Sequence, residues 1–110
     1  MTPRELYERL QSGEDVAAKM SHVQAVFFKE ILRRQAGDLA KEKCVEKIAF
    51  TPNNTNPWVV EIAFRNGELS EDAQATLFKM KENVHRTEIV TTDETTQVMF
   101  YIYMMEEDNE

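Results

Sequence analysis

The chain has 110 residues, of which 42% are hydrophobic and 30% are charged, and its net charge is −7 at neutral pH. This length and balance predict one ordered domain and fit a globular domain better than a disordered chain. The acidic excess makes nucleic-acid binding unlikely, because neutralising phosphates needs a basic surface. A local basic excess over residues 29–47 is assigned to a solvated helix face, with Lys29, Arg33 and Arg34 on the outward side.

The cysteine and hydropathy patterns predict a cytoplasmic protein. Cys44 is the only cysteine, so an internal disulfide is impossible. The first ten residues are too charged for a signal peptide. The longest apolar run, residues 98–105, is far shorter than the roughly 20 residues of a membrane helix. We therefore expect no membrane partner.

A short first helix is predicted over about residues 3–11. Thr2, Pro3 and Glu5 have the spacing of a capping box with proline at the first helical position. Its expected end is the polar stretch that begins at Ser12.

A second, amphipathic helix is expected to start at Ser12 or Asp15. Whether it kinks or stops at Gly37 is left open, since an interior glycine costs only about 1 kcal/mol against alanine. Apolar residues recur at steps of three and four, which predicts a stripe facing the core. That stripe contains Val16, Met20, Val23, Phe27 and Ile31, with Phe28 and Leu32 beside it.

After Cys44 the pattern changes to that of strands. Residues 45–51 and 58–64 are rich in β-branched and aromatic residues and are bounded by turn formers, which predicts a hairpin. Its loop is longer than a tight turn needs. Pro52 and Pro57 stiffen the loop ends, so structure alone accounts for the local chemistry.

The second half of the chain predicts one more helix and one more hairpin. A turn at residues 66–67 precedes a helix that Ser70 caps and that ends near His85. Residues 86–105 indicate two strands joined by a tight turn at 93–94.

The predicted fold class is therefore α+β, in the order α-α-β-β-α-β-β, within one globular domain over residues 1–105. The simplest packing is a two-layer fold: a mainly antiparallel four-stranded sheet with helices packed on one face. Strand order is left open. Residues 106–110 are predicted to form an acidic flexible tail, because they contain no apolar anchor.

No catalytic, cofactor-binding or metal-binding site is predicted. His22 and His85 lie on different predicted helices without a partner at metal-ligand spacing, so both are assigned to helix surfaces or ends. Cys44 is assigned to a small buried apolar position. Helix capping accounts for the clustered carboxylates, so we expect a protein that is not an enzyme and holds no cofactor.

The last strand suggests a protein interface. Alternation places Val98, Phe100, Ile102 and Met104 on one face and a second apolar set on the other, where a sheet normally shows polar residues. Tyrosine and methionine are enriched at interfaces. The alternatives are that the first helix or a loop covers this face, or that the tyrosines simply lie along an open sheet. The single Trp would then pack at a core margin. The candidate interface residues are Trp58, Met99, Tyr101, Tyr103 and Met105.

These features predict a small regulatory or binding module, such as an adaptor, an inhibitor, or an immunity-type or phage-type regulator. It would form a homodimer and bind a protein partner. A partner with a basic surface would complement the acidic charge of this chain. The alternative is a small-ligand-binding domain or accessory subunit of an enzyme, with a pocket between sheet and helices near Trp58 and the final tyrosines. Nucleic-acid binding through residues 29–47 ranks last.

Overall fold

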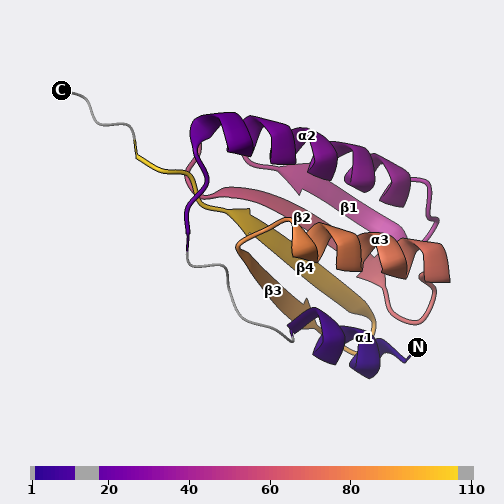
Figure 1. Cartoon of the computed structure of the whole chain (residues 1–110). Coiled ribbons are helices and arrows are strands. Elements are labelled where there is room, and N and C mark those ends of the chain that lie inside the picture. The colour runs from indigo at the N-terminus through magenta and orange to yellow at the C-terminus, as the bar shows by residue number, and fades with distance from the viewer. Residues whose placement is uncertain (1, 12–17, 107–110) are drawn as a thin grey trace.

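The computed structural model describes residues 2–11 and 18–106 of the chain. In this part of the chain, three helices lie on one face of a four-stranded antiparallel sheet (Figure 1), which confirms the predicted two-layer α+β fold. No helix within it is long and apolar enough to cross a bilayer. The elements are α1 (Pro3–Gln11), α2 (His22–Leu39), β1 (Val45–Phe50), β2 (Trp58–Arg65), α3 (Glu71–Glu82), β3 (Arg86–Thr91) and β4 (Thr95–Ile102).

The strand order in the sheet is β1-β2-β4-β3. β2 and β4 pair along their whole lengths, from Trp58 opposite Ile102 to Arg65 opposite Thr95. The two most apolar strands therefore occupy the centre of the sheet. Burial alternates strictly along both, as expected for strands covered on one face only.

The three helices lie side by side in the order α2, α3, α1 over the same face of the sheet (Figure 1). No helix or loop among the described residues covers the opposite face, which we call the open face. The alternative that α1 covers it is therefore wrong, since Leu6 and Leu10 of α1 belong to the core. Other fully buried side chains include Leu32, Leu77, Met80, Phe64 and Phe100.

The caps of α1 and α3 match the sequence prediction. The Glu5 amide donates to Thr2 Oγ1 at 3.1 Å, and the Thr2 amide donates to Glu5 Oε2 at 3.4 Å, which completes a capping box. Ser70 Oγ accepts from the Ala73 amide at 3.2 Å. In both helices the hydroxyl satisfies a backbone donor that has no partner within the helix.

The predicted start of the second helix is wrong. α2 begins at His22, with Ser21 as the N-cap and Gln24 completing a capping box. Met20 lies before the helix in extended backbone and bridges Met104. Of the positions assigned to the first turns, residues 12–17 lie outside the described part of the chain. The helix passes through Gly37 and ends at Leu39.

The predicted core-facing stripe of α2 is only partly confirmed. Leu32 is buried and Phe28 packs against the core, but Val23 and Phe27 face outward. Val23 and Phe27 are 82% and 63% exposed. Lys29, which was expected to face solvent, is only 5% exposed. Apolar residues occur on both the buried and the exposed side of this helix. The spacing of apolar residues alone therefore did not predict which side faces the core. The buried residues of α2 are Ala25, Lys29, Leu32, Ala36 and Leu39.

Candidate functional site

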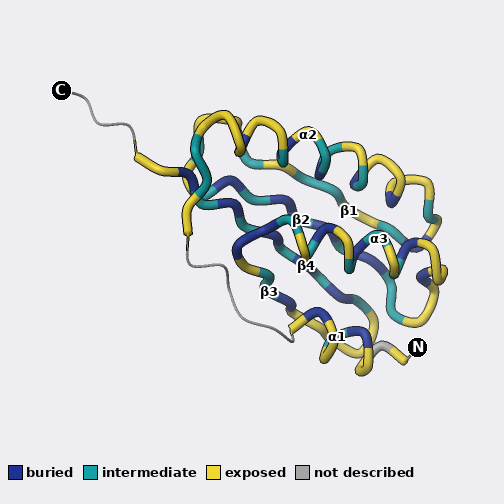
Figure 2. Tube along the Cα trace, viewed as in Figure 1, coloured by how far each residue is buried: buried dark blue, intermediate teal, exposed yellow. Residues whose placement is uncertain are grey.

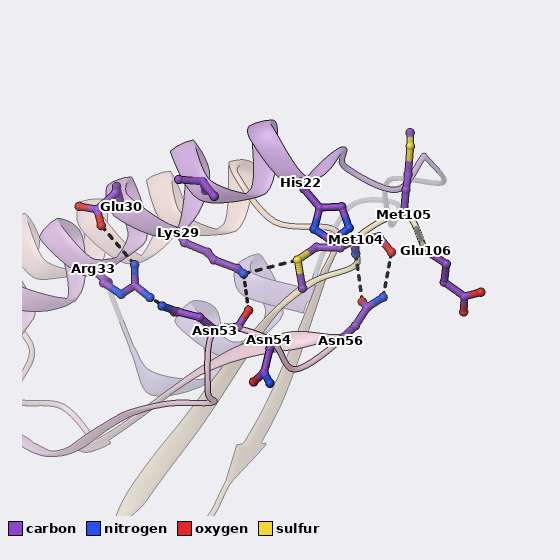
Figure 3. A pocket seen from close by; sticks show the side chains of 11 residues that line it. His22, Lys29, Glu30, Arg33, Asn53, Asn54, Asn56, Met104, Met105 and Glu106 are labelled. Atoms are coloured by element: carbon purple, nitrogen blue, oxygen red, sulfur yellow. Dashed lines mark hydrogen bonds and ion pairs between the residues drawn. The ribbon is translucent and has the colours of Figure 1, made fainter. Parts of the chain in front are cut away.

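A pocket of about 660 Å³ lies between α2, the loop 51–57 and the residues that follow β4. These three segments meet because Ser21 starts α2 beside the end of β4, and the β1–β2 loop reaches the same edge (Figure 3). We call it the α2 pocket. Its lining residues are His22, Val26, Lys29, Glu30, Arg33, Asn53, Asn54, Asn56, Met104, Met105 and Glu106.

The chain after β4 is held on both sides at this pocket. The Asn56 amide donates to Met104 O at 2.9 Å, and its Oδ1 accepts from the Met104 amide at 3.0 Å. On the other side, Met20 receives and returns backbone hydrogen bonds: its amide donates to Tyr103 O at 2.9 Å, and its carbonyl accepts from the Met105 amide at 2.8 Å. The Asn56 side chain thus takes the place of a neighbouring strand for the backbone of Met104. These hydrogen bonds fix the residues at the base of the pocket.

Lys29 lies at the buried wall of the pocket. Its Nζ donates to Asn53 O at 2.8 Å and lies 3.4 Å from Met104 Sδ. The ammonium is also 5.7 Å from the centroid of the Trp58 ring, within range of a cation–π interaction. No carboxylate in the described chain forms an ion pair with it. Burial, and then the charge of Arg33, lower the pKa of Lys29.

Arg33 lies one turn further along α2. It donates to Glu30 Oε1 at 3.2 Å and to Asn53 Oδ1. Its guanidinium carbon is 5.4 Å from the centroid of the Trp58 ring. Lys29 and Arg33 therefore hold the loop 51–57 against α2, and both lie within cation–π range of the Trp58 ring.

Three apolar side chains on the outward side of α2 form a second feature, which we call the α2 patch. Val23, Val26 and Phe27 are 82%, 62% and 63% exposed. Their spacing places them on one side of the helix, where Figure 2 shows mostly exposed positions. Val26 also lines the α2 pocket, so patch and pocket adjoin.

The open face of the sheet contains three of the predicted interface residues, two in β4 and one directly after it. Met99, Tyr101 and Tyr103 are half-buried, and the two tyrosine rings stack with centroids 6.3 Å apart. The Tyr101 hydroxyl donates to Glu88 Oε2 at 2.7 Å, and Arg86 lies over the Tyr101 ring. Burial and this hydrogen bond raise the pKa of Tyr101.

The other two candidate interface residues lie elsewhere. Trp58 is fully buried on the helix-covered face, stacked on Phe50 with ring centroids 5.9 Å apart. The structure thus separates it from Tyr101 and Tyr103. Met105 is half-exposed at the α2 pocket, past the end of β4. The predicted set therefore divides among the core, the open face and the pocket.

His85 and Cys44, which could in principle take part in catalysis or metal binding, are both buried. Of the two predicted positions for His85, a helix surface or a helix end, the surface is wrong, because His85 is buried in the segment that follows α3. Its Nδ1 accepts from the Tyr103 amide at 3.0 Å, and its Nε2 lies 2.7 Å from Ala18 O. Cys44 is buried as predicted, and burial followed by the Glu42 charge raises its pKa. Within the described ranges, no three His, Cys, Asp or Glu side chains gather in a way that could hold a metal ion.

The features that sequence patterns missed are the α2 pocket and the α2 patch. Both depend on which side of α2 meets the sheet and on the meeting of Met20, Asn56 and Met104 across long sequence separations. The only local signal was the loop 51–57, which has more asparagines than a turn needs. Comparison with protein-family models, with curated proteins and with solved structures finds no match to this chain.

Proposed function

We propose that this chain is a small acidic protein-binding module of the cytoplasm, without catalytic activity, and that the α2 patch is its main contact with a protein partner. The exposure of Val23, Val26 and Phe27 on one side of a helix carries the proposal. Single exposed apolar residues are common on protein surfaces. Burying an apolar surface is favourable by about 25 cal/mol per Å², so several neighbouring exposed apolar side chains would gain free energy if a partner covered them. Such patches mark interaction sites.

The chemistry of the partner follows from the patch and the charge of the chain. Aliphatic and aromatic side chains at helical spacing suit an apolar groove or helix face. The net charge of −7 favours basic residues around that apolar surface, because opposite charges accelerate association.

The test compares three immobilised proteins in extracts of the native cell. The wild type should retain a partner that the double variant Val23→Ser, Phe27→Ser loses. Both positions are exposed, so these changes remove contact surface without opening the core. Val90→Ser is the matched control, because Val90 is 53% exposed on β3, away from α2. Equal retention by the patch variant and the wild type would refute the proposal.

A second candidate function, the binding of a small ligand, is favoured by the α2 pocket. The pocket differs from the predicted one between sheet and helices near the final tyrosines. Trp58, Tyr101 and Tyr103 are not among its lining residues, although Lys29 and Arg33, which line it, lie near the Trp58 ring. Its volume of about 660 Å³ lies within the usual range for ligand sites.

A further inference from the structure

The charge of Lys29 is not balanced by an anion in the described chain. A buried ammonium without an anionic partner is costly, even when carbonyl and aromatic groups surround it. It has three N–H donors. The Asn53 carbonyl takes one, and the Met104 sulfur, a weak acceptor, lies near another. One donor and the whole positive charge are thus left for a further partner.

The other charges that line the α2 pocket do not supply that partner. Glu30 is engaged by Arg33, so these two charges compensate each other. Figure 3 shows the Glu106 carboxylate directed away from Lys29. Lys29 is therefore the lining cation that has no ion pair within the described residues, and Glu106 is a lining carboxylate directed away from it.

The rest of the pocket combines neutral polar and apolar groups. Asn54 lines it and makes no side-chain hydrogen bond within the described chain. Val26, Met104 and Met105 supply an apolar surface beside these amides. A few convergent polar groups next to apolar side chains are typical of sites for small organic molecules.

We propose that the α2 pocket binds a small organic carboxylate, whose oxygens accept a hydrogen bond from Lys29 Nζ and whose apolar portion lies on Val26 and Met105. A single negative charge matches the single uncompensated ammonium. A phosphate monoester carries nearly two charges at neutral pH and would exceed it. This site shares Val26 with the α2 patch but does not include Val23 or Phe27, so either proposal can fail without the other.

The first test uses a matched pair of probes, 4-phenylbutyrate and 4-phenylbutan-1-ol, titrated into the isotope-labelled wild type. The carboxylate should shift the backbone amide signals of residues at the pocket, above all Lys29, Asn53 and Met104. The alcohol, which lacks the charge, should bind at least about tenfold more weakly, as expected for the loss of a charge-assisted hydrogen bond. Equal affinity for both probes, or shifts confined to Val23 and Phe27, would overturn the proposal.

The second test changes charge at the pocket, once at its buried wall and once at an exposed lining position. Lys29→Met should abolish the preference for the carboxylate over the alcohol. Asn54→Asp adds a negative charge at an exposed lining position and should weaken carboxylate binding about threefold, the size expected of one exposed charge. Ala75→Glu adds the same charge at an exposed position of α3, outside the pocket, and should leave the affinity unchanged. If Asn54→Asp binds as tightly as Ala75→Glu, the pocket is not the carboxylate site.

Discussion

The buried ammonium of Lys29 is surrounded by the Asn53 carbonyl, the Met104 sulfur and the Trp58 ring. Its aliphatic stem takes the place of an apolar residue on the buried side of α2, between Ala25 and Leu32. The ammonium then emerges where the loop 51–57 and Met104 meet. A lysine in a helical pattern is normally assigned to solvent, so this placement was not visible in the sequence.

The lowered pKa of Lys29 gives a stability prediction with a definite sign. Between the lowered pKa and the ordinary value of 10.5, the unfolded chain binds this proton more than the folded chain does. Stability from this group therefore rises with pH across that window, and the charged group costs stability at pH 7. Lys29→Met removes the charge and keeps an apolar side chain, so it should raise the free energy of unfolding at pH 7 by about 1 kcal/mol.

Urea denaturation of both proteins between pH 7 and about 10.5 measures this effect. The advantage of Lys29→Met should shrink as the pH rises, and taking the difference cancels groups that both proteins share, such as Cys44 and Tyr101. Lys41→Met is the control, because Lys41 is exposed and its ion pair with Asp38 contributes little. A variant less stable than wild type at pH 7 would contradict the assignment.

The side chain of Asn56 fixes the segment that follows β4. Its amide both donates to and accepts from the backbone of Met104. Asn56→Asp replaces the donor by an oxygen that faces the Met104 carbonyl, so we expect a loss of about 1 to 2 kcal/mol in the free energy of unfolding.

Hydrogen exchange locates the effect of Asn56→Asp, since the amides of Met104 and Met105 should exchange faster. The neighbouring change Asn54→Asp adds the same charge without breaking a hydrogen bond, and should cost less than about 0.5 kcal/mol. Equal losses in the two variants would mean that charge, and not the amide contact, causes the effect.

At the scale of elements, the sequence predicted those boundaries that local chemistry decides. The caps at Thr2 and Ser70 and the alternation in β2 and β4 are local signals, and all of them are confirmed. The start of α2 was wrong because Met20 pairs with Met104 instead of continuing a helix, a contact that no local pattern encodes.

The face of α2 depended on packing. Small residues such as Ala25 and Ala36 let the helix approach the sheet closely, whereas the larger Val23 and Phe27 face outward. Hydrophobicity scales favour the second set, so the pattern pointed to the wrong side. The same error concealed the α2 patch and the helical part of the α2 pocket. Val23 and Phe27 were assigned to the core-facing stripe, and Lys29 was assigned to the outward side.

Gly37 gives a prediction for α2 as a whole. It lies inside the helix, and a Cβ at this position would meet no atom within 4 Å. Gly37→Ala should therefore raise the free energy of unfolding by about 0.5 to 1 kcal/mol, because alanine loses less backbone entropy on folding. Thermal denaturation measures it.

Gly67 is the matched control for Gly37. Its φ is 78°, in the left-handed region that disfavours side chains. Gly67→Ala should therefore destabilise the protein although no atom crowds the position. If Gly37→Ala also destabilised it, α2 would not continue through Gly37 as an unstrained helix.

At the scale of the whole molecule, the two layers present surfaces of different character. The helix layer presents the α2 patch with the α2 pocket beside it. The open face of the sheet combines tyrosines with charges of both signs, including Lys47 paired with Glu61 at 3.2 Å and Arg86 paired with Glu88. A face with both signs can match a second copy of itself across a twofold axis despite the net charge of the chain.

This complementarity underlies our last prediction, that two copies associate through their open faces. In sedimentation experiments the wild type should behave as a dimer. The double variant Tyr101→Glu, Tyr103→Glu should be a monomer, because it places four added carboxylates in the shared interface. Circular dichroism must show that this variant keeps its fold, since both tyrosines are half-buried.

The Val23→Ser, Phe27→Ser variant should remain a dimer, because the α2 patch lies on the other side of the molecule. A monomeric wild type, or a folded tyrosine variant that keeps the dimer mass, would exclude pairing through the open face. Loss of the dimer in the Val23→Ser, Phe27→Ser variant alone would assign self-association to α2.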